Sequence, residues 1–132
     1  MSSFIAKLQK RLRSEESGFT LIELLIVLVI IGILLAIAVP SYLGFKDRAN
    51  KKAAAANIRA AIPSAEAYYS DTNTYVGMDV TALKAIDSGL SSTVSVKAAS
   101  LSSTTYCLEA TVGGFTYHVS GPGGLVTAAA CP

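Results

Sequence analysis

An almost uninterrupted apolar run between Phe19 and Val39 constrains this chain more than any other feature. As a helix it would be about 31 Å long, which matches the hydrocarbon core of a bilayer. Its one ionisable side chain is Glu23. A carboxylate in an apolar helix costs several kcal/mol unless it is paired, so an acid at this place is a candidate functional residue. The run therefore predicts a membrane-spanning helix, and the purpose of Glu23 has to be explained.

The composition is that of one small domain attached to this apolar segment. Hydrophobic residues make up 52% of the 132 residues. The net charge of +2 comes from residues 1–18, where four Lys or Arg outnumber two Glu, so the remainder is balanced. No global basic field indicates a nucleic-acid-binding protein. Residues 1–18 fit either a weak helix on the cytoplasmic membrane face or a disordered basic segment.

The apolar run has three interpretations. An ordinary signal peptide would use Ala36-Ile37-Ala38 as its cleavage site, but Glu23 and the length of the run are unusual for one. A generic permanent anchor is the second. The third rests on a motif, because Gly18-Phe-Thr-Leu-Ile-Glu23 follows basic residues and precedes an apolar run that ends at Pro40. This pattern resembles the class III signal of type IV pilins and pseudopilins.

The resemblance implies a processing route. In that family a membrane prepilin peptidase cuts after the glycine on the cytoplasmic side and N-methylates the new first residue. Gly18 would be the last leader residue, and Phe19 would become N-methylphenylalanine. The likeness covers about residues 15–75 well, and this leader is longer than that of many type IVa pilins. The implied parts are a leader at 1–18, a transmembrane and filament-core helix at 19–40, and a head domain at 41–132.

The resemblance also implies a use for Glu23. Cleavage creates an ammonium group at Phe19, and in that family the glutamate pairs with the terminal amine of a neighbouring subunit during assembly. An unpaired charge among packed apolar helices is heavily penalised, so such a pair disfavours an axial slip of one subunit. A pair within one subunit is the alternative, because residues four apart share a helix face.

Two cysteines, Cys107 and Cys131, lie in the C-terminal quarter of the chain. An even count beyond a membrane-spanning segment favours one disulfide, whereas a cytosolic protein would keep free thiols. The bridge would resemble the C-terminal disulfide loop of many type IV pilins, with free or intermolecular thiols as the alternative. Basic residues are nearly equal in number on the two sides of the apolar run, so the positive-inside rule gives no orientation. The cysteine pair is better evidence that the C-terminal domain faces an oxidising compartment.

The whole chain predicts an α+β fold in which a long N-terminal helix packs on a small antiparallel sheet. The helix is expected over residues 19–70, bent or locally opened near Pro40 and bent again at Pro63. Its second half carries an apolar stripe at spacings of three and four residues: Ala54, Ile58, Ile62, Ala65 and Tyr69. A short helix is expected over residues 80–86, capped by Asp79.

Period-two alternation predicts strands at 93–97, 106–112 and 115–119. Gly113-Gly114 suits a two-residue hairpin turn between the last two. The predicted register sets these residues opposite each other on one face: Val112 and Phe115, Ala110 and Tyr117, Leu108 and Val119. The pairs on the other face are Thr111 and Thr116, Glu109 and His118, Cys107 and Ser120. Residues 125–130 are expected as a last edge strand that returns Cys131 to Cys107.

Catalytic and ligand-binding motifs are not apparent in the sequence. His118, the only histidine, is interpreted as a cross-strand surface partner of Glu109. Neither a glycine-rich phosphate loop nor a calcium-loop spacing is present. We therefore expect no enzyme activity, no metal, no cofactor and no small-molecule substrate.

The resemblance implies a structural function as the subunit of a type IV pilus-like surface filament. The expected partners are copies of the same chain in a helical filament, the prepilin peptidase, the inner-membrane assembly machinery and the membrane before assembly. The precursor would lie in the cytoplasmic (inner) membrane, and the assembled subunit in an extracellular filament with a role in motility, adhesion or DNA uptake. One alternative is a pseudopilin of a type II secretion system. Another is a membrane-anchored or exported binding domain with an ordinary signal.

Overall fold

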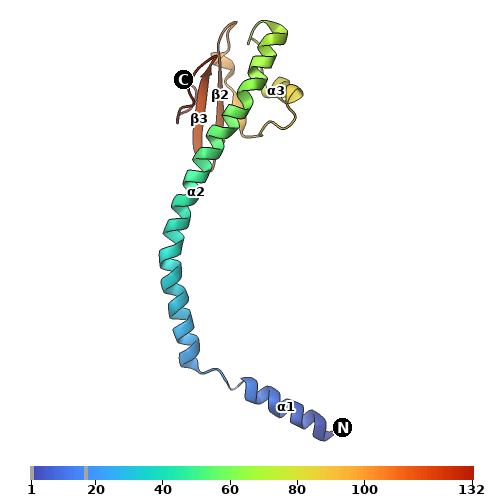
Figure 1. Cartoon of the computed structure of the whole chain (residues 1–132), viewed down its shortest axis with the longest axis vertical. Helices are drawn as coiled ribbons and strands as arrows, with labels where there is room; N and C mark the ends of the chain where they lie inside the picture. The colour runs from blue at the N-terminus through green and yellow to red at the C-terminus, as the bar shows by residue number, and fades with distance from the viewer. Residues whose placement is uncertain (1, 17) are drawn as a thin grey trace. The chain divides into compact units, whose positions relative to one another are not determined.

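The structure is a computed structural model that describes residues 2–16 and 18–132, with the side chains of residues 2–9 and 18–132. Its elements run in the order α1, α2, α3, β1, a short 3-10 turn, β2 and β3 (Figure 1). The chain divides into two compact units, residues 1–43 and 44–132, and α2 contributes to both.

The N-terminal unit is helical. α1 spans Ser2–Glu16, so of the two alternatives for residues 1–18 the structure has the helix. The backbone leaves the helical conformation at residues 18–20, and α2 begins at Leu21. The side chains of residues 10–17, which include three of the leader's four cations, lie outside the described part of the chain.

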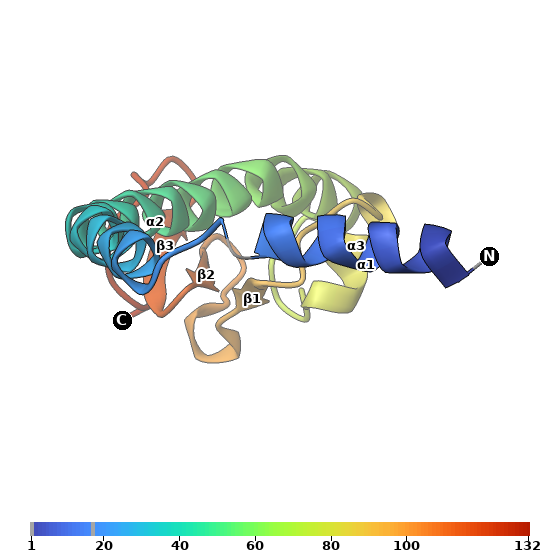
Figure 2. The same ribbon diagram turned by 90° about the horizontal axis from the view of Figure 1, so that it is seen from below.

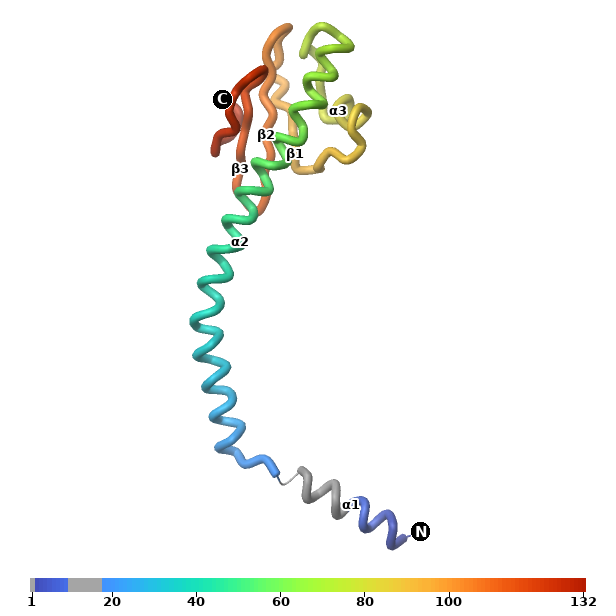
Figure 3. Tube along the Cα trace, viewed as in Figure 1, coloured from blue at the N-terminus to red at the C-terminus, as the bar shows by residue number. Residues whose placement is uncertain are grey.

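α2 is a single helix of 52 residues, Leu21–Thr72 (Figure 3). It confirms the predicted long helix, with each end shifted by two residues. The alternative of a local opening at Pro40 is wrong for this structure, because the helix is continuous through Pro40 and Pro63. A proline removes one donor and crowds the carbonyl four residues back, but the helix here continues on both sides of each proline. α2 ends where Asn73 takes a left-handed φ of 56° and its amide donates to the Tyr69 carbonyl at 2.7 Å.

The C-terminal half of α2 forms one layer of the head domain. Members of the predicted stripe are buried (Ala54, Ile58 and Ala65) or partly buried (Ile62 and Tyr69). Ala61, outside the predicted stripe, is buried as well, because it lies three residues after Ile58 on the same helix face. The small alanines let the sheet approach the helix closely.

The second layer is a three-stranded antiparallel sheet in the order β1-β2-β3, formed by Val94–Val96, Tyr106–Val112 and Phe115–Gly121. Every pair of the predicted hairpin register is confirmed. Both turn residues have positive φ, 58° at Gly113 and 85° at Gly114, as a type I′ turn requires. Figure 2 shows the strands along one side of α2.

The remaining segments close the head domain. α3 covers Val80–Ile86, as predicted, and the Asp79 carboxylate accepts a hydrogen bond from the Ala82 amide at 2.7 Å. The predicted edge strand at 125–130 is wrong, because this segment makes one isolated bridge, between His118 and Thr127. Side-chain contacts to the segment, described below, take the place of a strand ladder.

The core lies between α2 and the sheet and extends under α3. Its largest buried side chains come from every part of the head: Ile58, Tyr75, Met78, Leu83, Tyr106, Leu108 and Val119. Burying an apolar side chain of this size contributes about 1.5–3 kcal/mol. The head domain therefore has a hydrophobic core made entirely from its own residues.

Candidate functional site

The predicted cleavage motif lies in a short non-helical link before α2. Gly18, Phe19 and Thr20 are all exposed, and Phe19 has 74% of its surface exposed. Exposed backbone outside regular structure is the preferred place for proteolytic cleavage. The peptide bond between Gly18 and Phe19 therefore has the accessibility that the predicted cut requires.

Thr20 and Glu23 form a capping box at the start of α2. The Thr20 amide donates to Glu23 Oε2 at 3.0 Å, and the Glu23 amide donates to Thr20 Oγ1 at 3.3 Å. These bonds satisfy two of the amide groups that a helix N-terminus leaves without partners. The Thr20-x-x-Glu23 spacing is the sequence signal for this motif, although the predicted roles of Glu23 did not include it.

The capping box places the Glu23 carboxylate beside the backbone that cleavage would expose. Its partner amide, on Thr20, is one residue after Phe19, which would carry the new ammonium group. The carboxylate therefore lies near the position at which the predicted cut would create a terminal amine. Because Glu23 is exposed, an amine of another chain can also reach it.

The first half of α2 presents an uncovered apolar surface. Its most apolar window of 18 residues has a mean hydropathy of 3.2, and none of that window is buried within the molecule. The large apolar side chains of residues 21–39 range from 46% exposed at Ile31 to 88% exposed at Leu21. By length and composition, α2 is the one helix in the described residues that can cross a membrane. Such a surface needs cover from lipid or from other protein.

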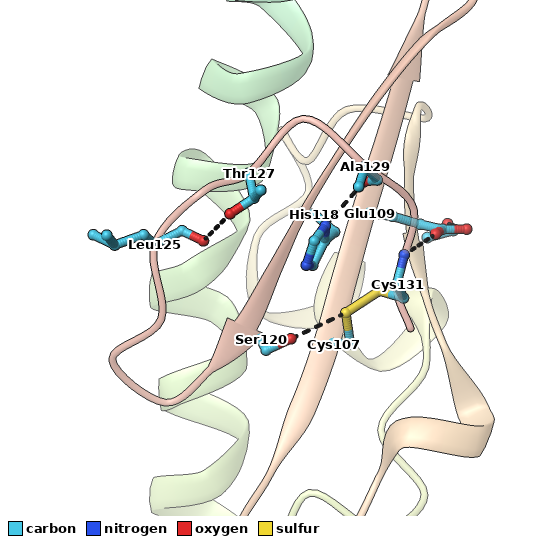
Figure 4. The surroundings of a disulfide bond; sticks show 9 residues. Cys107, Glu109, His118, Ser120, Leu125, Thr127, Ala129 and Cys131 are labelled. Atoms are coloured by element: carbon cyan, nitrogen blue, oxygen red, sulfur yellow. Dashed lines mark hydrogen bonds between the residues drawn. A yellow bond between two sulfur atoms is a disulfide. The ribbon is translucent and has the colours of Figure 1, made fainter.

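A disulfide joins the C-terminal segment to β2 (Figure 4). The structure contains the predicted bond between Cys107 and Cys131, whose Cα atoms lie 6.1 Å apart, and both residues are buried. The bond closes a loop with a sequence separation of 24 residues. A loop of this length corresponds to a stabilisation of about 3–4 kcal/mol in the chain-entropy model.

Glu109 and His118 also hold the C-terminal segment (Figure 4). They lie opposite each other across β2 and β3, as predicted. Each of them, however, makes a side-chain hydrogen bond to the segment. The Cys131 amide donates to Glu109 Oε2 at 3.0 Å, and His118 Nδ1 donates to the Ala129 carbonyl at 2.9 Å. The predicted surface pair is therefore better described as two anchors for the chain end.

Three tyrosines and Glu66 form a cluster at the boundary between α2 and the sheet. The Tyr75 ring centroid lies 4.7 Å from the centroids of both Tyr69 and Tyr106. The hydroxyls of Tyr75 and Tyr106 donate to the Glu66 carboxylate at 3.2 and 3.1 Å. Burial first, and then the nearby Glu66 charge, raises the pKa of Tyr75 to about 12 and also raises the pKa of Tyr106.

The sequence did not predict the contacts of Glu66 with the two tyrosines. Glu66 is exposed, but its hydrogen bond to Tyr106 joins residues 40 positions apart. No local pattern relates two such residues. Within residues 2–9 and 18–132, no group of three or more His, Cys, Asp or Glu side chains comes together as a metal site.

Known proteins resemble this chain both in the N-terminal motif and over a longer part of the sequence. Residues 13–39 match the family of the prokaryotic N-terminal methylation motif, a range that contains Gly18, Phe19 and Glu23. The chain is 40% identical over 96 residues to the type IV wide pilus major component of Thermus thermophilus. That alignment covers 70% of this chain and 71% of the Thermus protein.

Other similar proteins align over shorter segments. The type IV major pilin of Myxococcus xanthus is 40% identical over 65 residues, which are 49% of this chain and 30% of that pilin. The type II secretion system core protein G of Aeromonas hydrophila is 40% identical over 68 residues, which are 52% of this chain and 46% of that protein. This chain therefore spans less than half the length of these two relatives.

The identity with the Thermus protein extends over more than two thirds of both chains. The methylation motif, the long apolar helix and the small antiparallel sheet packed on that helix agree with it. The predicted α+β fold and the predicted pilin resemblance are both confirmed. This chain belongs to the type IV pilin family.

Proposed function

We propose that this protein is a structural subunit of a type IV pilus-like filament. One observation carries the proposal: the methylation motif at residues 13–39 leads into a helix whose apolar surface has no cover from the described residues of the chain. Such a surface can lie first in the bilayer and then against the same surface of other copies. No catalytic group of this chain is needed for that exchange.

The proposed precursor has three parts. Residues 1–18 are the leader, residues 19–40 are the membrane anchor that becomes the filament core, and residues 41–132 are the head domain. A prepilin peptidase removes the leader after Gly18 and methylates the amine of Phe19. The precursor lies in the inner membrane, where the assembly machinery takes subunits into an extracellular filament.

Glu23 selects the register in which the apolar helices pack. Apolar contacts between helices change little when one helix slides along another, so they set the axial position only weakly. A carboxylate and an ammonium buried among these helices must meet, because either one alone is strongly destabilising there. In the precursor the same carboxylate caps α2, which gives it a partner before the amine exists.

A pseudopilin of a type II secretion system is the second candidate. The matching segments cover 46% of the Aeromonas core protein G and 47% of the Vibrio cholerae one, against 71% of the Thermus pilus component. The longer match favours the pilus.

Mass analysis of the mature N-terminus tests the processing. We expect a chain that begins with N-methylated Phe19. A chain that begins at Val39, or one that keeps residues 1–18, would contradict the proposal and favour an ordinary signal or a permanent anchor. Gly18→Val supplies a matched control, because it changes only the residue before the cut and should leave an unprocessed precursor in the membrane.

Deletion of the gene separates the two candidates. A pilus subunit predicts that surface filaments seen by electron microscopy disappear while protein secretion continues. A pseudopilin predicts the opposite pattern, with secretion lost and surface filaments retained.

A further inference from the structure

A groove of about 500 Å³ lies between α2 and β3 in the head domain. Its lining consists of Lys51, Lys52, Ala55, Ala56, Arg59 and Tyr117. Lys51 Nζ lies 4.9 Å from the centroid of the Phe115 ring, at the edge of the hairpin turn. Within residues 18–132, these three cations form no ion pair with a carboxylate. This groove, called here the basic groove, is therefore a positively charged surface whose cations have no carboxylate partner among residues 18–132.

The charges of the head domain are separated along its length. Residues 44–60 contain five Lys or Arg and one Asp, and residues 61–92 contain four acids and one Lys. The acidic end consists of Glu66, Asp71, Asp79 and Asp87, all of which are exposed. Figures 1 and 3 show α3, which Asp79 and Asp87 flank, beside the C-terminal half of α2.

Hydrogen bonds hold three of these carboxylates in place without neutralising them. Glu66 accepts from two tyrosine hydroxyls, Asp79 from the Ala82 amide, and Asp87 from the Gly89 amide at 2.9 Å. The acidic end is thus a preorganised surface whose negative charge remains available to a partner.

One copy of the chain cannot pair its own two ends. With a rise of about 1.5 Å per residue, Lys51 and Glu66 are about 22 Å apart along α2, and Lys51 and Asp71 about 30 Å. The Debye length at physiological ionic strength is about 8 Å, so attraction over that distance within one head is screened.

We infer that the basic groove is the docking surface for the acidic end of the head domain of a second copy of this chain. This inference rests on the proposed filament, in which neighbouring copies run parallel. A displacement of about 20–30 Å along the helix axis brings the acidic end of one copy beside the basic groove of the next. Complementary charge then selects the neighbour and its register.

This neighbour differs from the one that Glu23 would meet. Glu23 and the amine of Phe19 are four residues apart, so pairing between copies needs an axial displacement of only about 6 Å. Contacts between the apolar helices therefore position one neighbouring copy, and contacts between the head domains position another.

Charge reversal in the full-length chain, expressed with its assembly machinery, tests the inference. Lys52→Glu with Arg59→Glu should lower filament yield by at least about tenfold, because like charges then face each other across the contact. The matched control compares two single reversals that make the same change in net charge. Arg59→Glu, within the groove, should lower the yield, whereas Lys97→Glu, which lies in neither the groove nor the acidic end, should keep the yield within about twofold of the wild type. Wild-type yield from the groove variant overturns the inference.

A compensating reversal identifies the occupant. Co-expression of the groove variant with a copy that carries Asp71→Lys and Asp87→Lys should restore filaments that contain both chains. Thermal unfolding of each detergent-solubilised variant checks that its head is folded, and Asp71→Lys alone replaces the double variant if Asp87 proves necessary for folding. A groove variant that stays unassembled in the presence of the compensating copy overturns the inference. If that variant also loses binding to phosphatidylglycerol vesicles, the groove is a lipid-binding surface instead. Failure of the wild-type chain to assemble overturns the proposed function as well, whereas a correctly methylated wild-type filament keeps it.

Discussion

Apolar side chains are exposed in residues 21–39, but those that form the core of the head domain are buried. In residues 21–39 every large apolar side chain is at least 46% exposed. In the head domain, Ile58, Leu83 and Leu108 are fully buried among residues of the same chain. Both regions include parts of one helix, α2, which is continuous from Leu21 to Thr72.

The difference separates two kinds of stability. The head domain gains its free energy of folding from internal contacts, so this free energy can be measured on a single copy of the chain. Residues 21–39 gain theirs only when lipid or other copies cover them, so their contribution appears in membrane insertion and in assembly. Substitutions in residues 21–39 should therefore leave the stability of the head domain unchanged, and substitutions in the core of the head domain should leave membrane insertion unchanged.

The largest effect is expected for Glu23→Ala, which should lower filament yield by at least about hundredfold. In the proposed filament this change leaves a buried Phe19 ammonium without its partner, at a cost of about 3–5 kcal/mol. Membrane insertion and the unfolding midpoint of the head should not change. Quantitative electron microscopy measures the filament yield, and denaturation of the solubilised chain measures the unfolding midpoint of the head.

Thr20→Ala is the control for the capping role of Glu23. It removes one half of the capping box but keeps the carboxylate, and loss of a cap costs about 0.5–2 kcal/mol. Equal loss of filaments in Thr20→Ala and Glu23→Ala would attribute the effect to the cap. Normal assembly of Glu23→Ala would refute the register role.

Removal of the disulfide should have the largest effect on the head domain. Cys107→Ala with Cys131→Ala is expected to lower the free energy of unfolding by about 3–4 kcal/mol, because the unfolded chain regains the freedom of the closed loop. Urea denaturation of the solubilised protein measures this change, and chemical reduction of the wild type should reproduce it. An unchanged denaturation midpoint would show that Glu109 and His118 hold the C-terminal segment without the bond.

Gly121→Ala should destabilise the head by about 1–3 kcal/mol through overpacking. A Cβ at this position would overlap Cζ of the Tyr106 ring, which is buried and packed against Tyr75. Gly44→Ala is the control, because a Cβ there meets nothing within 4 Å. That control should be neutral or stabilising, since alanine favours a helix over glycine by about 1 kcal/mol. The same urea midpoint for both variants would contradict the prediction.

The effect expected to be smallest at neutral pH is a loss of head stability that appears only at alkaline pH. Tyr75 has a folded pKa of about 12, and the pKa of Tyr106 is also raised, whereas tyrosine in an unfolded chain titrates near 10. The contribution of this pair is therefore complete below about pH 10 and is lost as the pH rises through about 12. Denaturation midpoints measured at intervals from pH 8 to about pH 12 follow the loss.

Glu66→Gln separates the two causes of that shift. Removing the carboxylate leaves burial as the main cause, so the decrease in stability between about pH 10 and pH 12 should become smaller. A decrease that stays as large as in the wild type would show that Glu66 contributes nothing to the raised tyrosine pKa values.

Much of the fold follows from local patterns in the sequence. The continuous apolar run and the alanine-rich segment predict α2, Asp79 predicts the start of α3, and alternation around Gly113-Gly114 predicts the complete hairpin register. These features were predictable because helix and strand periods come from backbone geometry, which any short segment expresses by itself. The capping box between Thr20 and Glu23 was equally readable from its spacing.

The partners of the polar side chains depend on the tertiary structure. The contact of Glu66 with Tyr106, the anchoring of the chain end by Glu109 and His118, and the close approach that requires Gly121 all join segments distant in sequence. The basic groove likewise exists only because β3 packs beside the cations of α2. The sequence therefore specifies the cleavage motif, the apolar helix and the strand pattern through residue order and spacing. Which charges remain available for a second copy is decided only when packing brings distant side chains together.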